Sequence, residues 1–221
     1  MVNLIIADAE LELIPAEIAR SSSARASAGR RNRRAEECLL DSSMHHSAMK
    51  GLPDAERRGR PDIVHFCLLI ALDSTLNRDG KLKTFVHTRN DDVIELDSST
   101  RLPRNYGRFT GLMEELLLRG KVGPDGRTLA RVLKMPLAEL VSGLGARSVV
   151  FSENGTPDRS LSCLQGVTDV TLIVGGFPHG DFRSDLSKFT HELVSISPTS
   201  LMSWTVLSVI LSSYHLRPFA P

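Results

Sequence analysis

The stretch Asp169–Gly180, which reads DVTLIVGGFPHG, decides the fold class of this sequence. Residues 169–174 have the length and the apolar composition of a buried strand, and a turn with Gly175, Gly176 and Gly180 follows directly. An open α/β sheet places its ligand crevice beyond the carboxyl ends of such strands. The glycine spacing differs from the G-x-G-x-x-G of dinucleotide-binding folds, so this turn either only redirects the chain or lets a ligand approach the backbone closely.

Strands and helices alternate on both sides of this stretch. We expect strands over residues 2–7, 38–41, 148–151 and 192–196, and helices over 63–72, 103–119, 128–140, 157–164, 184–189 and 201–214. A β-hairpin is expected within 81–98, where two strand-like runs flank residues 89–92. This alternation is typical of an α/β fold with a mainly parallel sheet and helices on both faces, here with the hairpin as an extension.

The composition is that of one globular domain over residues 1–221. The chain has 41% apolar and 24% charged residues, and 27 Lys and Arg nearly balance 26 Asp and Glu. A formal net charge of +1 cannot attract a polyanion to the molecule as a whole, so affinity for nucleic acid has to come from local clusters of charge. The composition also excludes wholesale disorder.

Signals for metal binding, export and membrane insertion are missing from the sequence. The three cysteines are far apart and the histidine pair at 45–46 lacks a metal-binding frame, so we expect no metal site and a reducing, intracellular setting. The N-terminal segment is acidic where a signal peptide is basic. The apolar stretch 201–214 is interrupted by serines and is shorter than the about 20 residues that cross a bilayer. We therefore expect neither export nor membrane contact.

Two arginine-rich segments stand out. Residues 20–34 contain six arginines and no acidic residue, which predicts a flexible basic loop over 20–36, either simply solvated or contacting an RNA backbone. The second segment holds Arg101, Arg104 and Arg108, and no acidic residue lies between Arg101 and Glu114. The spacing places Arg104 and Arg108 on one face of a helix. Because guanidinium groups offer forked donors to phosphate, this row favours polyanion binding over plain solvation.

Two further features have a defined chemistry. Arg60 and Asp62 flank Pro61 at the expected start of a helix, where the aspartate either caps the helix or holds the arginine. The loop 195–200 follows a strand and precedes a helix, as the glycine turn does. Two neighbouring strand ends with glycine or hydroxyl-bearing residues favour a small-molecule pocket between them. No pattern assigns a catalytic nucleophile or an obligatory base.

Several long blocks give the sequence a family resemblance. They are LLDSSMHHSAMK at 39–50, RRGRPDIVHFCLLIALDSTLNRDGKL at 57–82, TRLPRNYGRFTGLMEELL at 100–117, IVGGFPHG at 173–180 and VSIS at 194–197. With these blocks in one order over nearly the entire chain, the sequence resembles the SPOUT-superfamily enzymes that methylate N1 of a pseudouridine in small-subunit ribosomal RNA.

The resemblance implies a homodimer with a C-terminal trefoil knot, in which S-adenosylmethionine binds in a bent form. The cofactor contacts that it implies in this sequence are Gly175, Gly180, Val194, Ser195, Ile196, Ser197, Pro198 and Leu201. The RNA-binding residues that it implies are Arg60, Arg101, Arg104 and Arg108, with Asp62 positioning Arg60. Pro178 and the continuation PTSL at 198–201 depart from the family pattern.

The function implied by the resemblance is S-adenosylmethionine-dependent N1-methylation of a pseudouridine in small-subunit ribosomal RNA, in support of small-subunit biogenesis. The length of the chain favours a cytoplasmic, archaeal-type member, whereas a eukaryotic member is expected in the nucleolus. Two alternatives stay open: a non-catalytic assembly factor that binds pre-ribosomal RNA, and a SPOUT enzyme that methylates transfer RNA.

Overall fold

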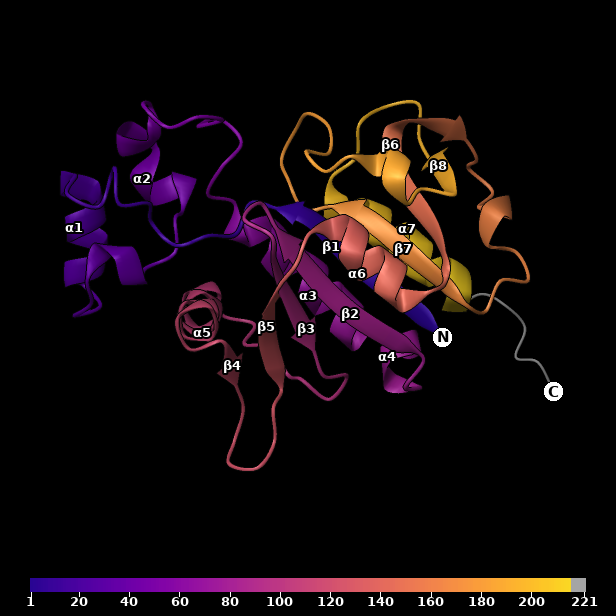
Figure 1. The fold of residues 1–221 in the computed structure, drawn as a ribbon, viewed down its shortest axis with the longest axis horizontal. Coiled ribbons are helices and arrows are strands. Elements are labelled where there is room, and N and C mark those ends of the chain that lie inside the picture. Colours follow the sequence, from indigo (N-terminus) through magenta and orange to yellow (C-terminus); the bar gives the residue numbers. More distant parts are fainter. Residues whose placement is uncertain (216–221) are drawn as a thin grey trace.

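The computed structural model describes residues 1–215, which form an eight-stranded sheet with helices packed against it (Figure 1). The strands are β1 (Val2–Ala9), β2 (Leu82–Thr88), β3 (Asp92–Leu96), β4 (Lys121–Val122), β5 (Ala130–Lys134), β6 (Arg147–Pro157), β7 (Val170–Gly175) and β8 (Glu192–Ser195). Their order across the sheet is β4-β5-β3-β2-β1-β7-β6-β8. From β2 to β8 in this order the pairing is parallel, and from β2 to β4 it is antiparallel. The expected mainly parallel sheet is confirmed.

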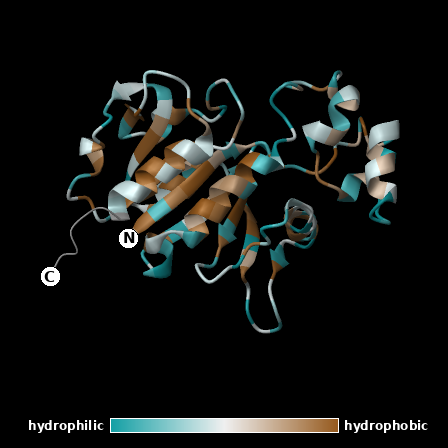
Figure 2. Ribbon diagram, turned by 180° about the vertical axis from the view of Figure 1, so that it is seen from behind, coloured by the Kyte–Doolittle hydropathy of each residue, from teal (hydrophilic) through white to brown (hydrophobic). Residues whose placement is uncertain are grey.

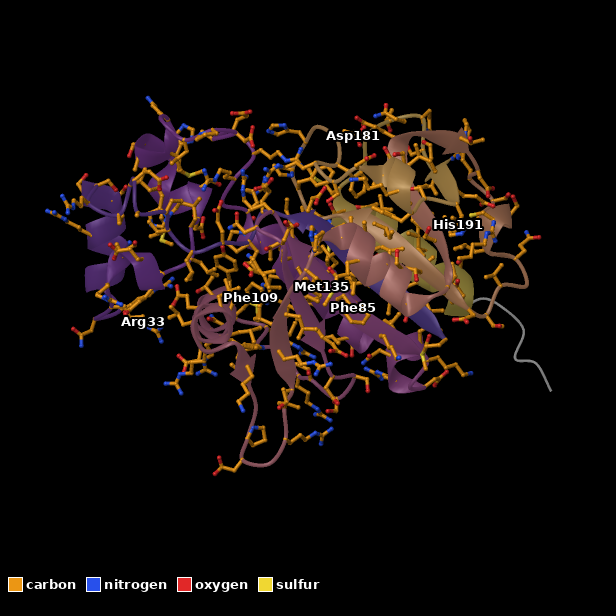
Figure 3. All side chains as sticks on the ribbon, in the orientation of Figure 1. Arg33, Phe85, Phe109, Met135, Asp181 and His191 are labelled. Atoms are coloured by element: carbon orange, nitrogen blue, oxygen red, sulfur yellow. The ribbon has the colours of Figure 1, made fainter. Side chains whose placement is uncertain are left out.

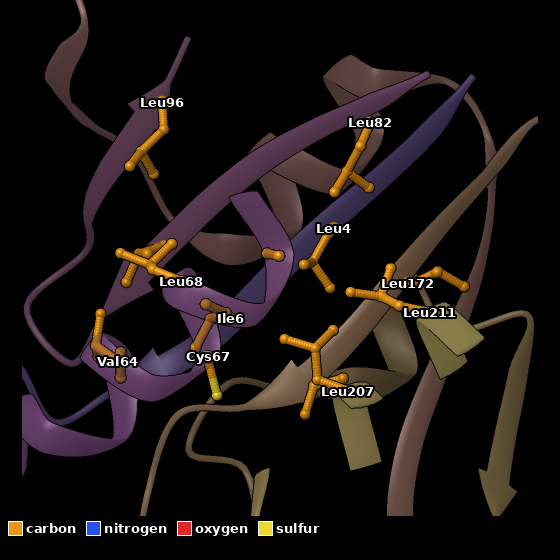
Figure 4. Packing of buried hydrophobic residues seen from close by; sticks show 14 of the residues in the cluster. Leu4, Ile6, Val64, Cys67, Leu68, Leu82, Leu96, Leu172, Leu207 and Leu211 are labelled. Carbon is orange, nitrogen blue, oxygen red and sulfur yellow. The ribbon is translucent and has the colours of Figure 1, made fainter. Parts of the chain in front are cut away.

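Helices cover both faces of the sheet, as expected. They are α1 (Ser22–Gly29), α2 (Ser42–Met49), α3 (Pro61–Asp73), α4 (Thr75–Arg78), α5 (Tyr106–Arg119), α6 (Leu137–Leu144) and α7 (Ser203–His215). Side chains of the central strand β1 alternate in direction, so Leu4 and Ile6 pack with α3 and α7 (Figure 4), whereas Ile5 and Ala7 pack with α6. The apolar strands therefore lie between two layers of helix (Figure 2).

The ends of α3 and α5 follow from local sequence. Pro61 opens α3, because its missing N–H and fixed φ suit the first helical position. Asn105 caps α5 by accepting a hydrogen bond from the N–H of Arg108, and Gly120 ends the helix in the left-handed region at φ 76°. Because α5 begins only at Tyr106, Arg104 precedes the helix, and the prediction of one helical face for Arg104 and Arg108 is wrong.

The prediction of a flexible basic loop over 20–36 is also wrong. Helix α1 occupies residues 22–29 of this segment, and the Ser21 hydroxyl caps it by accepting a hydrogen bond from the N–H of Ala24. Alanines give the segment helix propensity, and Ala24 and Ala28 are buried in a small apolar cluster shared with α2. Two of the arginines are bound by α5, Arg31 by Glu114 and Arg33 by Glu115. Arg33 is labelled in Figure 3 beside that helix. Together α1 and α2 project from one end of the sheet (Figure 1).

Other expected elements differ where tertiary contacts override local composition. Residues 130–134 of the helix expected over 128–140 form strand β5, which pairs with β3, and α6 starts only after Pro136. The helices expected over 157–164 and 184–189 are reduced to the short 3-10 helices Ser162–Leu164 and Leu186–Lys188. Of the strand expected over 38–41, a single bridge between Leu13 and Leu39 is present. The hairpin within 81–98 is confirmed, but β2 pairs with β1, so it belongs to the main sheet.

The C-terminal segment runs from one edge of the sheet back to the middle of one face. Strand β8 lies at one edge beside β6, and α7 then returns to pack against α3 and β7. A trefoil knot needs such a return path, and the knot itself stays a prediction. Of the helices over residues 1–215, none combines the length and the apolar character needed to cross a membrane.

Candidate functional site

A cleft lies where β7 and β8 end and α7 begins, beside the middle of β6. It has a volume of about 260 Å³ and lies at the carboxyl ends of parallel strands, where α/β sheets bind ligands. Of the expected cofactor contacts, the cleft is lined by Gly175, Gly180, Val194, Ser195, Ile196, Ser197 and Leu201. Pro198 instead lines a neighbouring hollow that shares the serine loop with the cleft. The structure thus brings the predicted small-molecule residues together, with that one exception.

Two glycines allow a close approach to the backbone on the β7 side of the cleft. The ring of Phe177 lies 2.6 Å from the position that a Cβ of Gly175 would take, so the ring fills the space over this glycine. Gly180 has φ +81°, a backbone conformation that other residues adopt only with strain. The rings of Phe177 and Phe182 meet edge to face at 5.2 Å between centroids. This side of the cleft is therefore an aromatic wall beside closely approaching backbone.

The β8 side of the cleft is polar and held by its own hydroxyl groups. The hydroxyl of Ser195 donates to the carbonyl of Ser197 at 2.9 Å, and the hydroxyl of Ser197 accepts from the N–H of Thr199 at 3.1 Å. Apolar side chains of Val174 and Val206 line the interior. A cleft with apolar surface and a few convergent polar groups suits a nucleoside-like ligand that also carries a polar chain.

The structure shows the expected pairing of Arg60 with Asp62. Two hydrogen bonds of 2.8 and 2.7 Å join the guanidinium group to the carboxylate. The bond to Asp62 raises the pKa of Arg60, and the charge of Asp41 adds to this effect. The hydroxyl of Tyr106, the first residue of α5, donates to Asp41. Arg60 therefore lies near the start of α5.

The other expected RNA-binding arginines are exposed. Arg101, Arg104 and Arg108 lie before or within the first turn of α5. None of them forms an ion pair with any residue that the structure describes. Unpaired guanidinium groups at the surface are available to a polyanion.

The backbone of Glu10, a residue that the sequence analysis did not select, connects Arg60 with the glycine turn of the cleft. The backbone N–H of Glu10 donates to the carbonyl of Gly176 at 3.1 Å, and its carbonyl accepts from the N–H of Arg60 at 3.0 Å. The side chain of Glu10 is fully buried and binds Arg57 and Arg89. An acidic residue directly after an apolar strand was the only sequence signal for it. No group of three or more His, Cys, Asp or Glu within residues 1–215 is placed to hold a metal ion.

Comparison with known proteins gives this arrangement a family. The family model described as EMG1/NEP1 methyltransferase matches residues 4–215. The chain belongs to the EMG1/NEP1 methyltransferase family. It is 48% identical to "Ribosomal RNA small subunit methyltransferase Nep1" of Thermococcus onnurineus, over 97% of this chain and 98% of that protein. It is also 48% identical to the protein of the same description from Pyrococcus furiosus, over 96% of each chain.

A solved member of the EMG1/NEP1 family has the same fold. The crystal structure of Archaeoglobus fulgidus Nep1 bound to S-adenosylhomocysteine superposes with a TM-score of 0.87, at 41% identity and 96% coverage of both chains. The fold class expected from the family resemblance is therefore confirmed. S-adenosylhomocysteine is the product that S-adenosylmethionine leaves after it has given up its methyl group.

Proposed function

We propose that the chain is an S-adenosylmethionine-dependent methyltransferase of small-subunit ribosomal RNA. The observation that carries the proposal is the gathering of the expected cofactor residues around one strand-end cleft, in a chain of the EMG1/NEP1 methyltransferase family. The descriptions of the two archaeal relatives support the RNA substrate, and their source supports a cytoplasmic location.

The residues of the cleft fit this cofactor. Close backbone at Gly175 and the aromatic wall of Phe177 suit a flat adenine ring, and the serine loop offers hydroxyl and backbone groups to the ribose and the amino acid part. When bound, the cofactor supplies a methyl group activated by a sulfonium. The protein has to hold that group in line with the attacking atom.

We propose N1 of a flipped-out pseudouridine as the attacking atom. Uridine has its glycosidic nitrogen at the corresponding place and offers no such nucleophile, so the selectivity for pseudouridine lies in the chemistry of the base. As N1 loses its proton, negative charge spreads over the ring, and Arg60, fixed by Asp62, is the charged group that we assign to stabilise it. No side chain is assigned as the base.

The RNA is held by Arg60, Arg101, Arg104 and Arg108 in this proposal. Helix α1 and the residues that flank it add further exposed arginines, because Arg20, Arg25 and Arg30 form no ion pair within residues 1–215. The ion pair of Arg31 with Glu114 attaches this helix to α5, which also carries Arg108. Of the two alternatives for residues 20–36, backbone contact is thus the one that the exposed side chains favour.

We further propose a homodimer formed through α3 and α7. Phe66 on α3 is 50% exposed although its ring lies 5.2 Å from that of Trp204 on α7. Met202 and Val209 add exposed apolar surface at 54% and 41%. Apolar side chains that gather on two packed helices are typical of an interface. The replacement Phe66→Ser should lower the molar mass measured by light scattering towards that of one chain, and an unchanged mass would contradict this interface.

The experiment for the whole proposal is methyl transfer to a matched pair of RNA hairpins. With methyl-labelled S-adenosylmethionine we expect label in a small-subunit hairpin that contains pseudouridine and none in its uridine twin. Equal labelling of both would contradict N1 as the nucleophile, and labelling of transfer RNA alone would favour the transfer RNA enzyme. RNA binding without calorimetric binding of S-adenosylmethionine would favour the non-catalytic assembly factor.

A further inference from the structure

Glu10 joins the two parts of the proposed site through its backbone. It follows β1 directly, and its N–H and C=O groups are bonded to Gly176 and Arg60, as described above. Gly176 begins the turn that forms the aromatic side of the cleft, and Arg60 is the arginine held by Asp62. A displacement of Glu10 therefore moves both the cofactor side and the RNA side of the site.

The side chain of Glu10 makes a second connection through Arg57. The Nε of Arg57 donates to the Glu10 carboxylate at 2.8 Å, and Arg89 donates to its other oxygen at 2.6 Å. The Glu10 side chain is 0% exposed, and those of Arg57 and Arg89 are 11% and 6% exposed. Such a buried carboxylate is tolerated only when it is paired, so both arginines are held in fixed positions.

Arg57 contacts the wall of the cleft directly. Its Nη1 donates to the carbonyl of Asp181 at 2.6 Å, and its guanidinium carbon lies 4.1 Å from the centroid of the Phe177 ring. Both Asp181, labelled in Figure 3, and Phe177 line the cleft. The Nη2 of Arg57 is buried without a hydrogen-bond partner among the described residues, which costs free energy. In this orientation Arg57 binds Glu10 and the cleft wall at the same time, but its Nη2 donor stays without a hydrogen bond.

The ion pair of Arg58 with Glu12 shows that a buried arginine next to Arg57 does not need contacts with the cleft wall. Arg58 binds Glu12 with two hydrogen bonds of 2.8 Å, and its side chain is 10% exposed, nearly the same as that of Arg57. Its remaining hydrogen bond goes to the carbonyl of Pro53, outside the cleft. Arg58 is thus a matched counterpart of Arg57 whose own hydrogen bonds do not reach the cleft, although Arg89 also pairs with Glu12 at 3.7 Å.

We propose that Glu10 and Arg57 are positioning residues that couple the cofactor cleft to Arg60. In this proposal, which rests on the proposed function, ligand in the cleft orders the Phe177–Asp181 wall, and Arg57 and Glu10 transmit that order to Arg60. Cofactor and RNA then strengthen the binding of each other, and because coupling between two sites is reciprocal, either ligand can report it.

The test compares Arg57→Lys with Arg58→Lys. Lysine keeps the positive charge beside the glutamate but loses the flat ring contact and the fork that reaches two acceptors. We measure the Kd of S-adenosylhomocysteine by calorimetry, with and without the pseudouridine hairpin, together with the melting temperature. In the wild type we expect RNA to tighten S-adenosylhomocysteine binding about tenfold. In Arg57→Lys we expect weaker binding and no effect of RNA, whereas Arg58→Lys lowers only the melting temperature.

Two results would overturn the coupling. One is a wild-type Kd that is the same with and without RNA, and the other is an RNA effect in Arg57→Lys as large as in Arg58→Lys. Should Arg57→Lys fail to melt cooperatively, Glu10→Gln takes its place with the same expected loss, because the amide keeps the shape but weakens both ion pairs. A wild type that neither binds S-adenosylhomocysteine nor transfers methyl groups contradicts the proposed function instead.

Discussion

The carboxylate of Asp8 accepts hydrogen bonds from the backbone N–H of Ser184 at 2.9 Å and from its hydroxyl at 2.7 Å, across 176 positions of sequence. The N–H of Arg183 adds a third bond at 2.7 Å. Asp8 itself has φ 50°, in the left-handed region that an aspartate adopts only rarely. The loop that begins at the glycine turn of the cleft is therefore fixed at its far end to the first strand, at a residue whose backbone is strained.

Stability in acid should depend on this anchor. Burial raises the pKa of the Asp8 carboxyl, but hydrogen bonds from His87 and Ser184 outweigh burial and lower the pKa from 3.8 to about 2. Because the folded pKa lies below the unfolded one, the stabilisation is complete above about pH 4 and is lost as the pH falls towards 2, by up to about 2 kcal/mol. Denaturant unfolding between pH 5 and pH 2 should show a shallower loss in Asp8→Asn, and parallel curves would contradict the anchor.

The two adjacent glycines of the turn should respond differently to alanine. A Cβ at Gly176 would lie 2.8 Å from the Cα of Ala9, which is backbone and cannot move away, so Gly176→Ala should lower stability by about 1–3 kcal/mol. The nearest atoms at Gly175 belong to the Phe177 ring, which can swing into the cleft. Gly175→Ala should therefore keep most of the stability and weaken S-adenosylhomocysteine binding. Thermal melting measures the change in stability and calorimetry the change in S-adenosylhomocysteine binding. If the two variants lose the same stability and the same affinity, the distinction between Gly175 and Gly176 is wrong.

The sequence was sufficient for elements whose local signals agree with the tertiary structure. Strand β7, helix α3 and the end of helix α5 lie within one or two residues of where they were expected. Strand β5 was missed because its pairing with β3 outweighs a composition that also suits a helix. The segment 20–36 was misjudged because Ala24 and Ala28 are buried by α2, a partner that no local pattern announces.

The candidate site divides in the same way. The strand-end loops and the pairing of Arg60 with Asp62 could be predicted, since each depends on residues close together in sequence. The contacts of Glu10 with Arg57 and of Asp8 with Ser184 join positions that are far apart. The sequence around a single acidic residue at the end of a strand does not indicate its distant partner, so only the folded chain reveals these two connections.

Asp62→Gly should lower stability and RNA binding, and any loss of methyl transfer should follow from the displacement of Arg60. The change removes the partner of Arg60 and an acidic group from the first turn of α3, and it places glycine in a helix at a cost of about 1 kcal/mol. Asp73→Gly at the other end of α3 is the control, because Asp73 pairs with the exposed Arg78 instead. We expect a lower melting temperature for both variants and a higher RNA Kd for Asp62→Gly alone. If Asp62→Gly melts and binds RNA like the wild type but does not turn over, Asp62 takes part in the chemistry.

Arg104→Ala and Arg108→Ala should weaken RNA binding and flatten its dependence on salt. An arginine that contacts a phosphate releases counterions, so its loss should reduce the slope of log K against log salt by about 0.7–0.9. Arg131→Ala is the matched control, since this exposed arginine is already paired with Glu95 at 2.6 Å and has little charge left for a phosphate. The Kd of S-adenosylhomocysteine without RNA should stay unchanged in all three variants. If the slope falls by the same amount in Arg131→Ala, RNA affinity depends only on the net charge of the protein. A binding surface formed by Arg104 and Arg108 requires a smaller change in Arg131→Ala than in the other two variants.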